Sequence, residues 1–388
     1  MKVVLVNTLT PGGAYVACKR LSYALQKQGV EISLIEIKAT KWNFLWERFC
    51  IWIANRFSRK NLFATSIANT GTDISKLRVV READIIHLHW VNQGGLSLYN
   101  IKLLQSLGKP IVWTMHDMWP FTGICHYAYD CDEYERQCEH CKQAETILTN
   151  YAFKTKQQFF HYFNFVGCSN WITSLAKRSS LIRSCNILSI PNPIDTEFYK
   201  PIPKREAREK LSLDLSKRYI VFGAMNTTTS IKGFSFIQEA DKHLQTDNIE
   251  YLVFGKNSAE VVKQLTHHVH SMGYVHDEYY KKLLYCAADV FVIPSLAENL
   301  PNMIMETMAC ATPCVGFNIG GIPEMIDHKK NGYVAQYKDA FDFAKGIDWV
   351  LSSQENLGDV ARIKVEEVYK ESVVANQYIQ LYQSLLKK

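Results

Sequence analysis

Short apolar segments alternate with longer segments of helical spacing along the whole chain. Apolar runs without strict alternation are typical of parallel strands that helices cover on both faces. In the first half, this pattern predicts five strands, at residues 2–8, 31–37, 83–90, 109–116 and 165–169. In the second half it predicts four more, at residues 219–224, 250–255, 289–294 and 313–317. The expected fold class is therefore α/β, with two parallel sheets.

Two prolines, Pro191 and Pro193, separate the two series of predicted strands and suit an interdomain connection. We therefore predict a first domain at residues 1–190 and a second at 191–372. A helix-spaced apolar segment at 373–388 is expected to pack back on the first domain. In open α/β sheets, ligands bind beyond the carboxyl ends of the strands, so a cleft between two facing domains is the expected site.

Composition narrows the class of protein. The chain has 388 residues, which suits two domains, and its formal net charge is +6. This mild charge does not indicate a nucleic-acid partner, but it is compatible with anionic small molecules or an anionic membrane surface. The apolar run Val3–Val6 is too short for a signal peptide, and no segment reaches the roughly 20 apolar residues of a spanning helix. A cytoplasmic protein with reduced cysteines is expected.

The most informative segment is 294–310, which follows a predicted strand and leads into a predicted helix. Pro301 suits the first helical position, where its missing N–H costs nothing. The backbone N–H groups of residues 299–302 would then form a cradle for an anion at the helix N-terminus. Glu298 in the loop and Glu306 in the helix can accept hydrogen bonds from hydroxyls of one ligand, such as a ribose diol.

Several motifs in this order make the chain resemble glycosyltransferase family 4. They are Gly12-Gly13, Thr114-Met115-His116-Asp117, Ser169-Asn170-Trp171, Pro191-Asn192-Pro193-Ile194-Asp195, Lys232-Gly233, Ala288-Asp289, the Glu298 and Glu306 pair, and Gly320-Gly321-Ile322-Pro323-Glu324. The resemblance implies a GT-B architecture, in which two Rossmann-like domains face an interdomain cleft. It also implies sugar transfer from a nucleotide-diphosphate sugar with retention of anomeric configuration and without a catalytic cofactor.

The resemblance also implies roles for single residues. Glu306 would hold the nucleotide ribose, and Glu298 would contact the donor sugar. The resemblance further implies that the backbone of four residues surrounds the sugar and the diphosphate: Asn299, Leu300, Pro301 and Asn302. Lys232 suits the leaving diphosphate, because its ammonium supplies a point positive charge. The family commonly adds an arginine to this lysine, and no residue is assigned to that second cation here.

In the first domain, Gly12 and Gly13 separate the first strand from a helix and would let a phosphate or sugar approach the backbone. A plain tight turn is the alternative. His116 ends a predicted strand, and in similar enzymes a histidine here lies near the donor sugar. We predict polar contact with the sugar or support of developing positive charge; the alternative is a structural histidine partnered by Asp117.

Four cysteines fall within seventeen residues and end in a Cys-x-x-Cys: Cys125, Cys131, Cys138 and Cys141. Four thiolates could hold a structural zinc ion, with free thiols or a redox pair as the alternative. Farther along, His267, His268 and His270 are interpreted as part of a solvated segment without a metal.

Residues 38–60 carry six Lys or Arg against one Glu, and they contain an apolar helical stripe at 42, 46, 49, 53 and 57. Such a helix could rest on an anionic membrane and present a lipid-linked acceptor. The alternative is an amphipathic helix that packs on its own domain.

The sequence thus predicts a glycosyltransferase that moves a sugar to a glycan or polyprenyl-linked acceptor, in cell-surface polysaccharide synthesis, at the inner face of the cytoplasmic membrane. Two alternatives are a GT-B-like epimerase or phosphorylase, and a non-catalytic scaffold that binds a sugar nucleotide. The scaffold alternative is retained because the arginine common in this family has no assigned counterpart here.

Overall fold

The computed structural model describes residues 1–9, 12–144 and 146–387. The chain divides into two compact units, of which the second is Ile194–Val373. The first unit contains the chain up to Pro193, together with the chain from Val374 onward. The predicted C-terminal helix is α15 (Glu371–Leu386), and nearly all of it belongs to the first unit.

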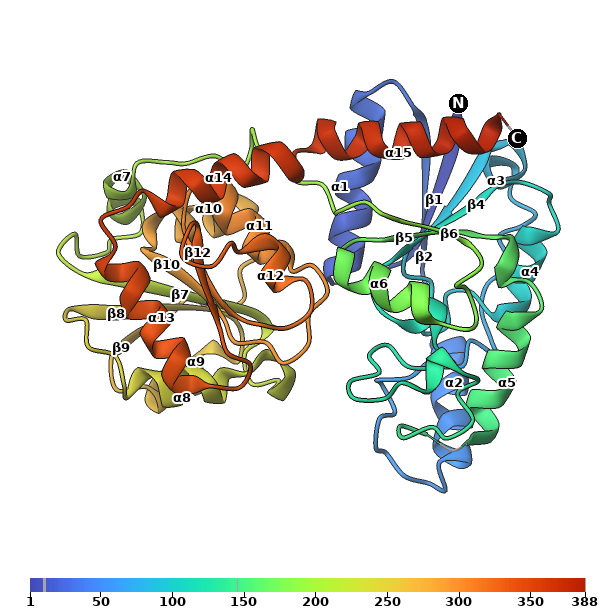
Figure 1. Cartoon of the computed structure of the whole chain (residues 1–388), viewed down its shortest axis with the longest axis horizontal. Helices are drawn as coiled ribbons and strands as arrows, with labels where there is room; N and C mark the ends of the chain where they lie inside the picture. The colour runs from blue at the N-terminus through green and yellow to red at the C-terminus, as the bar shows by residue number, and fades with distance from the viewer. Residues whose placement is uncertain (10–11, 145, 388) are drawn as a thin grey trace. The chain divides into compact units, whose positions relative to one another are not determined.

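The first unit is built on a six-stranded parallel sheet with the order β2-β1-β3-β4-β5-β6 (Figure 1). Its strands are β1 (Lys2–Thr8), β2 (Glu31–Ile37), β3 (Ile85–Leu88), β4 (Ile111–Met115), β5 (Asn164–Gly167) and β6 (Asn186–Ser189). Its helices are α1 (Gly13–Lys27), α2 (Lys41–Ala54), α3 (Arg78–Glu82), α4 (Leu98–Gln105), α5 (Thr146–Gln157), α6 (Asn170–Arg178) and α15.

Helices cover both faces of this sheet. Side chains alternate between the two faces along each strand, so each strand contributes to both cores. In β1, Val3 and Leu5 pack in a core that α1 and α15 complete. Val4 and Val6 pack in the opposite core, which includes residues of α4, α5 and α6. The apolar, non-alternating strand sequences predicted for a doubly covered parallel sheet therefore follow from this packing.

The second unit repeats this plan with the strand order β12-β11-β10-β7-β8-β9, again with every neighbouring pair parallel. Its strands are β7 (Arg218–Asn226), β8 (Ile249–Lys256), β9 (His268–Ser271), β10 (Val290–Ile293), β11 (Cys314–Phe317) and β12 (Gly332–Ala335). Its helices are α7 (Lys204–Lys210), α8 (Phe234–Asp241), α9 (Ser258–Val261), α10 (Glu278–Ala287), α11 (Asn302–Ala309), α12 (Ile322–Met325), α13 (Ala340–Ser352) and α14 (Leu357–Val368).

Each of the nine predicted strands corresponds to a strand of the structure, and three further strands, β6, β9 and β12, were not predicted. All three lie at sheet edges. β6 and β9 are largely solvated, and all three have only four residues, so their sequences lack a long apolar run. His268 and His270, predicted in a solvated segment, lie on the edge strand β9, where His268 is exposed and His270 is half-buried.

Within the described part of the chain, no helix combines the length and the apolarity that crossing a membrane requires.

Candidate functional site

The loop that carries Glu298 leaves the carboxyl end of β10 and leads into α11. Pro301 has φ −69° and ψ 118° and is the N-cap of α11, one position before the helical position predicted for it. Asn302 is therefore the first helical residue. Asn299 and Leu300 are buried beneath the loop. The backbone at 299–302 thus lies at the N-terminus of α11.

Glycine allows two neighbouring loops to approach each other at Lys232. Gly233 has φ 70°, and a Cβ there would lie 1.9 Å from the carbonyl oxygen of Pro294. The Leu296 N–H donates a hydrogen bond of 2.8 Å to the Ile231 oxygen. These contacts bring the Lys232 Nζ against the Glu298 Oε1, and the two side chains are 29% and 13% exposed.

A second glycine fixes the Glu298 loop from its other side. Gly320 has φ 61°, and a Cβ there would meet the Glu298 oxygen at 1.7 Å. The Gly321 N–H donates to the Asn299 oxygen at 2.9 Å. Larger residues would separate these loops, so the glycine-rich turn predicted near a ligand serves first to position Glu298.

Glu306 is 3% exposed on α11, where a carboxylate needs polar partners. The Tyr285 hydroxyl on α10 donates a hydrogen bond of 2.9 Å to its Oε2. Burial, with the Glu306 charge, raises the pKa of Tyr285 well above its usual value, so the phenol stays a donor. Sequence reasoning missed Tyr285, because a single tyrosine on a predicted helix carries no motif.

In the first unit, Gly12 is the N-cap of α1 and Gly13 is its first residue. Gly12 has an extended φ of 174°, and a Cβ there would meet no atom within 4 Å. A tight left-handed turn is therefore not the reason for glycine at this position. The open space leaves the backbone at the helix N-terminus accessible, as the site prediction requires.

His116 follows β4 and is half-buried beside another histidine. Its Nε2 lies 3.0 Å from the His89 Nδ1, and the two rings are stacked with centroids 5.2 Å apart. Burial lowers the pKa of His116 to about 4. At neutral pH the ring is therefore uncharged and acts as a hydrogen-bonding group rather than as a cation.

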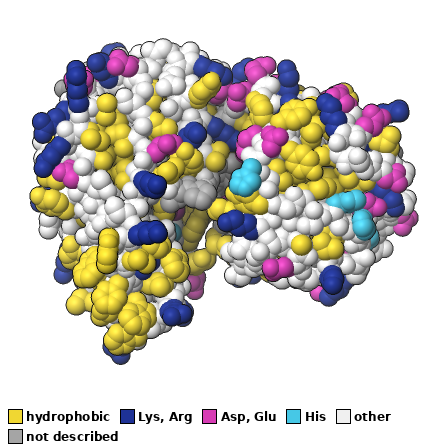
Figure 2. Space-filling view, turned by 180° about the vertical axis from the view of Figure 1, so that it is seen from behind, with side chains coloured by type: hydrophobic (Ala, Val, Ile, Leu, Met, Phe, Trp, Pro, Cys, Tyr) yellow, Lys and Arg dark blue, Asp and Glu magenta, His cyan; other side chains and the backbone are white. Residues whose placement is uncertain are grey.

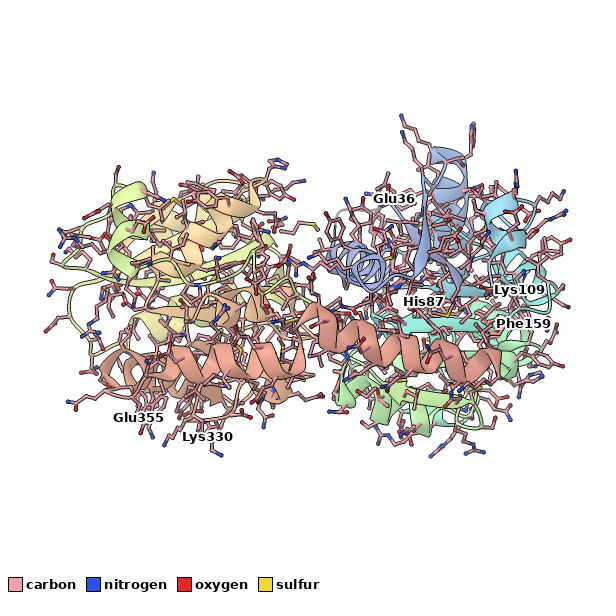
Figure 3. All side chains as sticks on the ribbon, turned by 90° about the horizontal axis from the view of Figure 1, so that it is seen from above. Glu36, His87, Lys109, Phe159, Lys330 and Glu355 are labelled. Carbon is pink, nitrogen blue, oxygen red and sulfur yellow. The ribbon has the colours of Figure 1, made fainter. Side chains whose placement is uncertain are left out.

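A second polar chain lies beside the first and ties α15 to the sheet. His87, labelled in Figure 3, has its Nδ1 2.6 Å from the Tyr382 hydroxyl and its Nε2 2.8 Å from the Thr114 hydroxyl. Thr114 also bonds the Tyr378 hydroxyl at 2.8 Å. Burial lowers the pKa of His87 to about 3. This chain supports the interpretation of His87 as a structural residue.

Asp117 accepts hydrogen bonds from the Trp90 Nε1 at 2.8 Å and from the His126 Nδ1 at 2.6 Å. The other nitrogen of His126 lies 3.0 Å from the Ser66 hydroxyl. Both ring nitrogens of His126 are thus engaged by protein groups, so this histidine is not available to a metal at the adjacent cysteines.

The four cysteines pack on the core of the first unit, with Cys125 and Cys138 buried. A hydrogen bond from the Cys125 thiol lowers the pKa of Cys141 to about 5. Near them the fully buried Lys156 ammonium donates to the oxygens of Trp119 at 2.7 Å and Thr122 at 3.0 Å. The cysteines are not among the described groups of three ligand atoms that lie within 4.8 Å of one another. Zinc at these cysteines stays a prediction.

The stripe predicted in residues 38–60 forms one face of α2 and the turn after it, and this face is turned to solvent. Trp42 is 83% exposed and Phe57 is 64% exposed. We call this surface the α2 patch; it consists of Trp42, Leu45, Trp46, Phe49, Ile53 and Phe57. Figure 2 shows hydrophobic side chains gathered at the lower left tip of the molecule, with basic groups beside them. The helix packs on its own unit through the opposite side, which includes the buried Ile51, while the stripe itself stays exposed.

A parallel α/β sheet with a lysine–glutamate pair and a helix N-terminus beyond the carboxyl ends of its strands, as in the second unit, is a usual setting for a nucleotide-binding site. The family description "Glycosyltransferase Family 4" matches residues 11–198, and "Glycosyl transferases group 1" matches residues 216–353. The chain belongs to glycosyltransferase family 4, whose members are retaining enzymes.

Individual relatives agree with this assignment. An uncharacterized glycosyltransferase of Haemophilus influenzae is 24% identical and covers 95% of this chain and 96% of its own length. The N,N'-diacetylbacillosaminyl-diphospho-undecaprenol alpha-1,3-N-acetylgalactosaminyltransferase of Campylobacter jejuni is 26% identical over 62% of this chain and 65% of its own length. Matches to several curated relatives span only 28% to 65% of those proteins.

The fold agrees as well. The crystal structure of Anabaena HepE in complex with UDP-glucose superposes with a TM-score of 0.67 at 15% identity, covering 99% of this chain and 100% of that one. The predicted GT-B architecture is confirmed. The chain is a retaining glycosyltransferase that uses a nucleotide-sugar donor.

Proposed function

We propose that this enzyme transfers a sugar from a UDP-sugar to a polyprenyl-diphosphate-linked acceptor during cell-surface polysaccharide synthesis. Two relatives act on undecaprenyl-diphosphate-linked sugars by name, and a structural neighbour binds UDP-glucose. The observation that carries the proposal is the Lys232–Glu298 pair, which glycines hold at the carboxyl end of the second sheet.

In this proposal the Lys232 ammonium stabilises the diphosphate as the sugar–phosphate bond breaks. Glu298, which contacts Lys232 in the free enzyme, turns to the hydroxyls of the donor sugar when the diphosphate takes its place. The Glu306 carboxylate, oriented by Tyr285, accepts hydrogen bonds from the two ribose hydroxyls. The backbone at 299–302 surrounds the sugar and diphosphate, with the N–H groups of its residues other than Pro301 as donors.

We also propose roles for two groups of the first unit. His116 contacts the donor sugar through a neutral ring, since burial keeps it unprotonated. Gly12, around which a Cβ would meet no atom within 4 Å, and Gly13 are proposed to let a phosphate or sugar approach the N-terminus of α1. The departing diphosphate takes the acceptor proton, so no protein base is assigned.

A lipid-linked acceptor places the enzyme at a membrane surface. The α2 patch is flanked by exposed basic residues: Lys38, Lys41, Arg56, Arg59 and Lys60. Aromatic side chains enter the interface between headgroups and acyl chains, and lysine or arginine near an anionic surface contributes about 1 kcal/mol each. We infer that α2 rests on the anionic inner face of the cytoplasmic membrane.

The test measures donor binding by calorimetry and transfer to a polyprenyl-diphosphate-linked sugar. Glu306→Ala should weaken UDP binding about 10- to 100-fold, the loss of two charge-assisted hydrogen bonds. Glu298→Ala should chiefly lower kcat, and Lys232→Ala should lower kcat about 100- to 1000-fold. Glu355→Ala, an exposed glutamate of the same unit labelled in Figure 3, is the matched control.

Wild-type kinetics for both Glu298→Ala and Glu306→Ala would remove the proposed donor site. Binding of UDP-sugars without turnover on any lipid-linked acceptor would favour the scaffold instead. Release of a free epimerised sugar nucleotide without transfer would favour the epimerase.

A further inference from the structure

Two histidines and a glutamate lie together on one face of the second sheet. Glu250 on β8 is opposite His268 on β9 in the parallel register, and β9 is the edge strand. Alternate residues of a strand share a face, so His270 lies on the same face as His268. The edge position leaves this group beside solvent, with His268 exposed and the other two half-buried.

The geometry is close to that of a metal site. The three ligand atoms all lie within 4.8 Å of one another. The Glu250 Oε2 is 2.7 Å from the His270 Nε2, and the two imidazole centroids are 4.7 Å apart. Bonds of about 2.0–2.1 Å to one zinc ion place ligand atoms roughly 3.3 Å apart, so side-chain rotations at the exposed edge would complete the set.

We propose that Glu250, His268 and His270 bind one divalent transition-metal ion. Two imidazoles and a carboxylate suit zinc, nickel or copper, whereas magnesium and calcium prefer oxygen ligands only. Three protein ligands leave at least one position for water, and the exposed side of His268 provides the entry path.

Neighbouring residues hold the glutamate in place for this role. The Lys217 Nζ lies 3.6 Å from the Glu250 Oε1, while the Oε2 faces His270. The Tyr219 ring, 6.0 Å from the His270 ring, forms one wall of the group. Lys217 therefore occupies one carboxylate oxygen and leaves the other for the metal, as groups around metal ligands commonly do.

The position of the site determines what the ion can do. Glu250 and His268 lie at the amino ends of β8 and β9, whereas Lys232 and Glu298 follow the carboxyl ends of β7 and β10. All these strands are parallel, so the two groups belong to opposite ends of the sheet. The ion would clamp the four-residue edge strand to β8 without touching the donor, independently of the proposed transfer reaction.

The test is calorimetric titration of the full chain with Ni²⁺ after treatment with EDTA. We expect one site that His268→Ala and His270→Ala each weaken at least about 10-fold, the loss of one ligand. His267→Ala is the matched control: this neighbouring histidine is held by the Asp241 Oδ1 at 2.6 Å and lies outside the group. It should bind Ni²⁺ like the wild type.

A second readout guards against misfolding. Ni²⁺ should raise the melting temperature of the wild type and of His267→Ala, and this shift should be lost in both site variants. The metal-free melting temperature of His268→Ala should equal that of the wild type, since His268 is at the surface. No Ni²⁺ binding by the wild type at millimolar concentration, or unchanged binding in both site variants, would overturn the proposal; the latter result would assign the ion elsewhere, for instance to the cysteines.

Discussion

Helices α2 and α15 have apolar residues at similar helical spacing, but the apolar face of α15 is buried in the core and that of α2 is exposed to solvent. On α15, Val374, Tyr378 and Tyr382 face the core and are at most 1% exposed. On α2, Trp42 and Trp46 are more than half exposed. Hydrophobic periodicity therefore locates a helix and its apolar face, but it does not determine whether that face meets protein or another apolar phase.

The inner face of α2 is held by a charged pair instead of an apolar stripe. The Glu47 Oε1 accepts hydrogen bonds from the N–H groups of Ile67 at 2.9 Å and Ala68 at 2.8 Å. The Arg48 Nη2 lies 2.9 Å from the Glu47 Oε2, and its Nη1 donates to the Thr65 oxygen at 2.9 Å. These bonds fix which side of α2 points inward.

The largest expected effect comes from breaking this pair. Glu47→Ala should lower the free energy of unfolding by about 3–5 kcal/mol, because it leaves the Arg48 charge buried without its partner. Unfolding in urea, followed by circular dichroism, measures the change. Glu82→Ala on α3 removes a glutamate from an exposed ion pair with Arg78 and is the control. Equal stability of Glu47→Ala and Glu82→Ala would show that α2 is anchored in another way.

This pair also shows where prediction from sequence reaches its limit. Eight of the nine predicted strands are central in their sheets, and burial on both faces gives such strands a recognisable apolar run. The burial of Glu47 and Arg48 could not be predicted from the local sequence, because their partners lie about twenty residues farther along the chain. The partners of a buried charge depend on tertiary structure, which periodicity does not contain.

In the candidate site, too, some residues could be proposed from the sequence and others could not. Lys232, Glu298 and Glu306 stand in motifs and could be proposed from the sequence, and their donor roles stay predictions. Tyr285 and His89 could not be proposed, because each acts through a neighbour that the fold supplies. The alignment of His268 with Glu250 could not be predicted for a related reason, since the edge strand that provides it has no apolar run.

The outer face of α2 gives the next effect in size. Replacing Trp42, Trp46 and Phe49 together by Ser should lower binding to anionic vesicles about 100-fold, because three aromatic groups no longer enter the bilayer interface. Stability should not fall, since the side chains are exposed in the free protein. Co-sedimentation with phosphatidylglycerol vesicles, and with neutral vesicles for comparison, measures the binding.

Phe341, 65% exposed in the second unit, provides a matched aromatic control. Phe341→Ser should bind vesicles like the wild type. If the triple variant also binds like the wild type, the α2 patch is not a membrane contact. If the triple variant loses stability instead, the patch packs on protein, and α2 would resemble α15 after all.

The smallest effect concerns α15, whose inner face buries neutral polar groups where α2 buries charges. Burial lowers the pKa of His87 to about 3, from an ordinary value of 6.5, so the unfolded chain takes up a proton that the folded chain refuses. The contribution of His87 to stability is therefore complete above pH 6.5 and is lost as the pH falls toward 3. Between pH 6.5 and 5 the loss should be about 1.5 kcal/mol.

His87→Gln should flatten this decline, whereas His161→Gln, at an exposed position, should keep it. Urea unfolding at a series of pH values gives the slope for each protein. The slopes are compared rather than the absolute stabilities, because removing His87 also breaks its bonds to Tyr382 and Thr114. If His87→Gln and the wild type lose stability in parallel, His87 is not the group that makes α15 sensitive to acid, and the neighbouring buried histidines His89 and His116 become the ones to change.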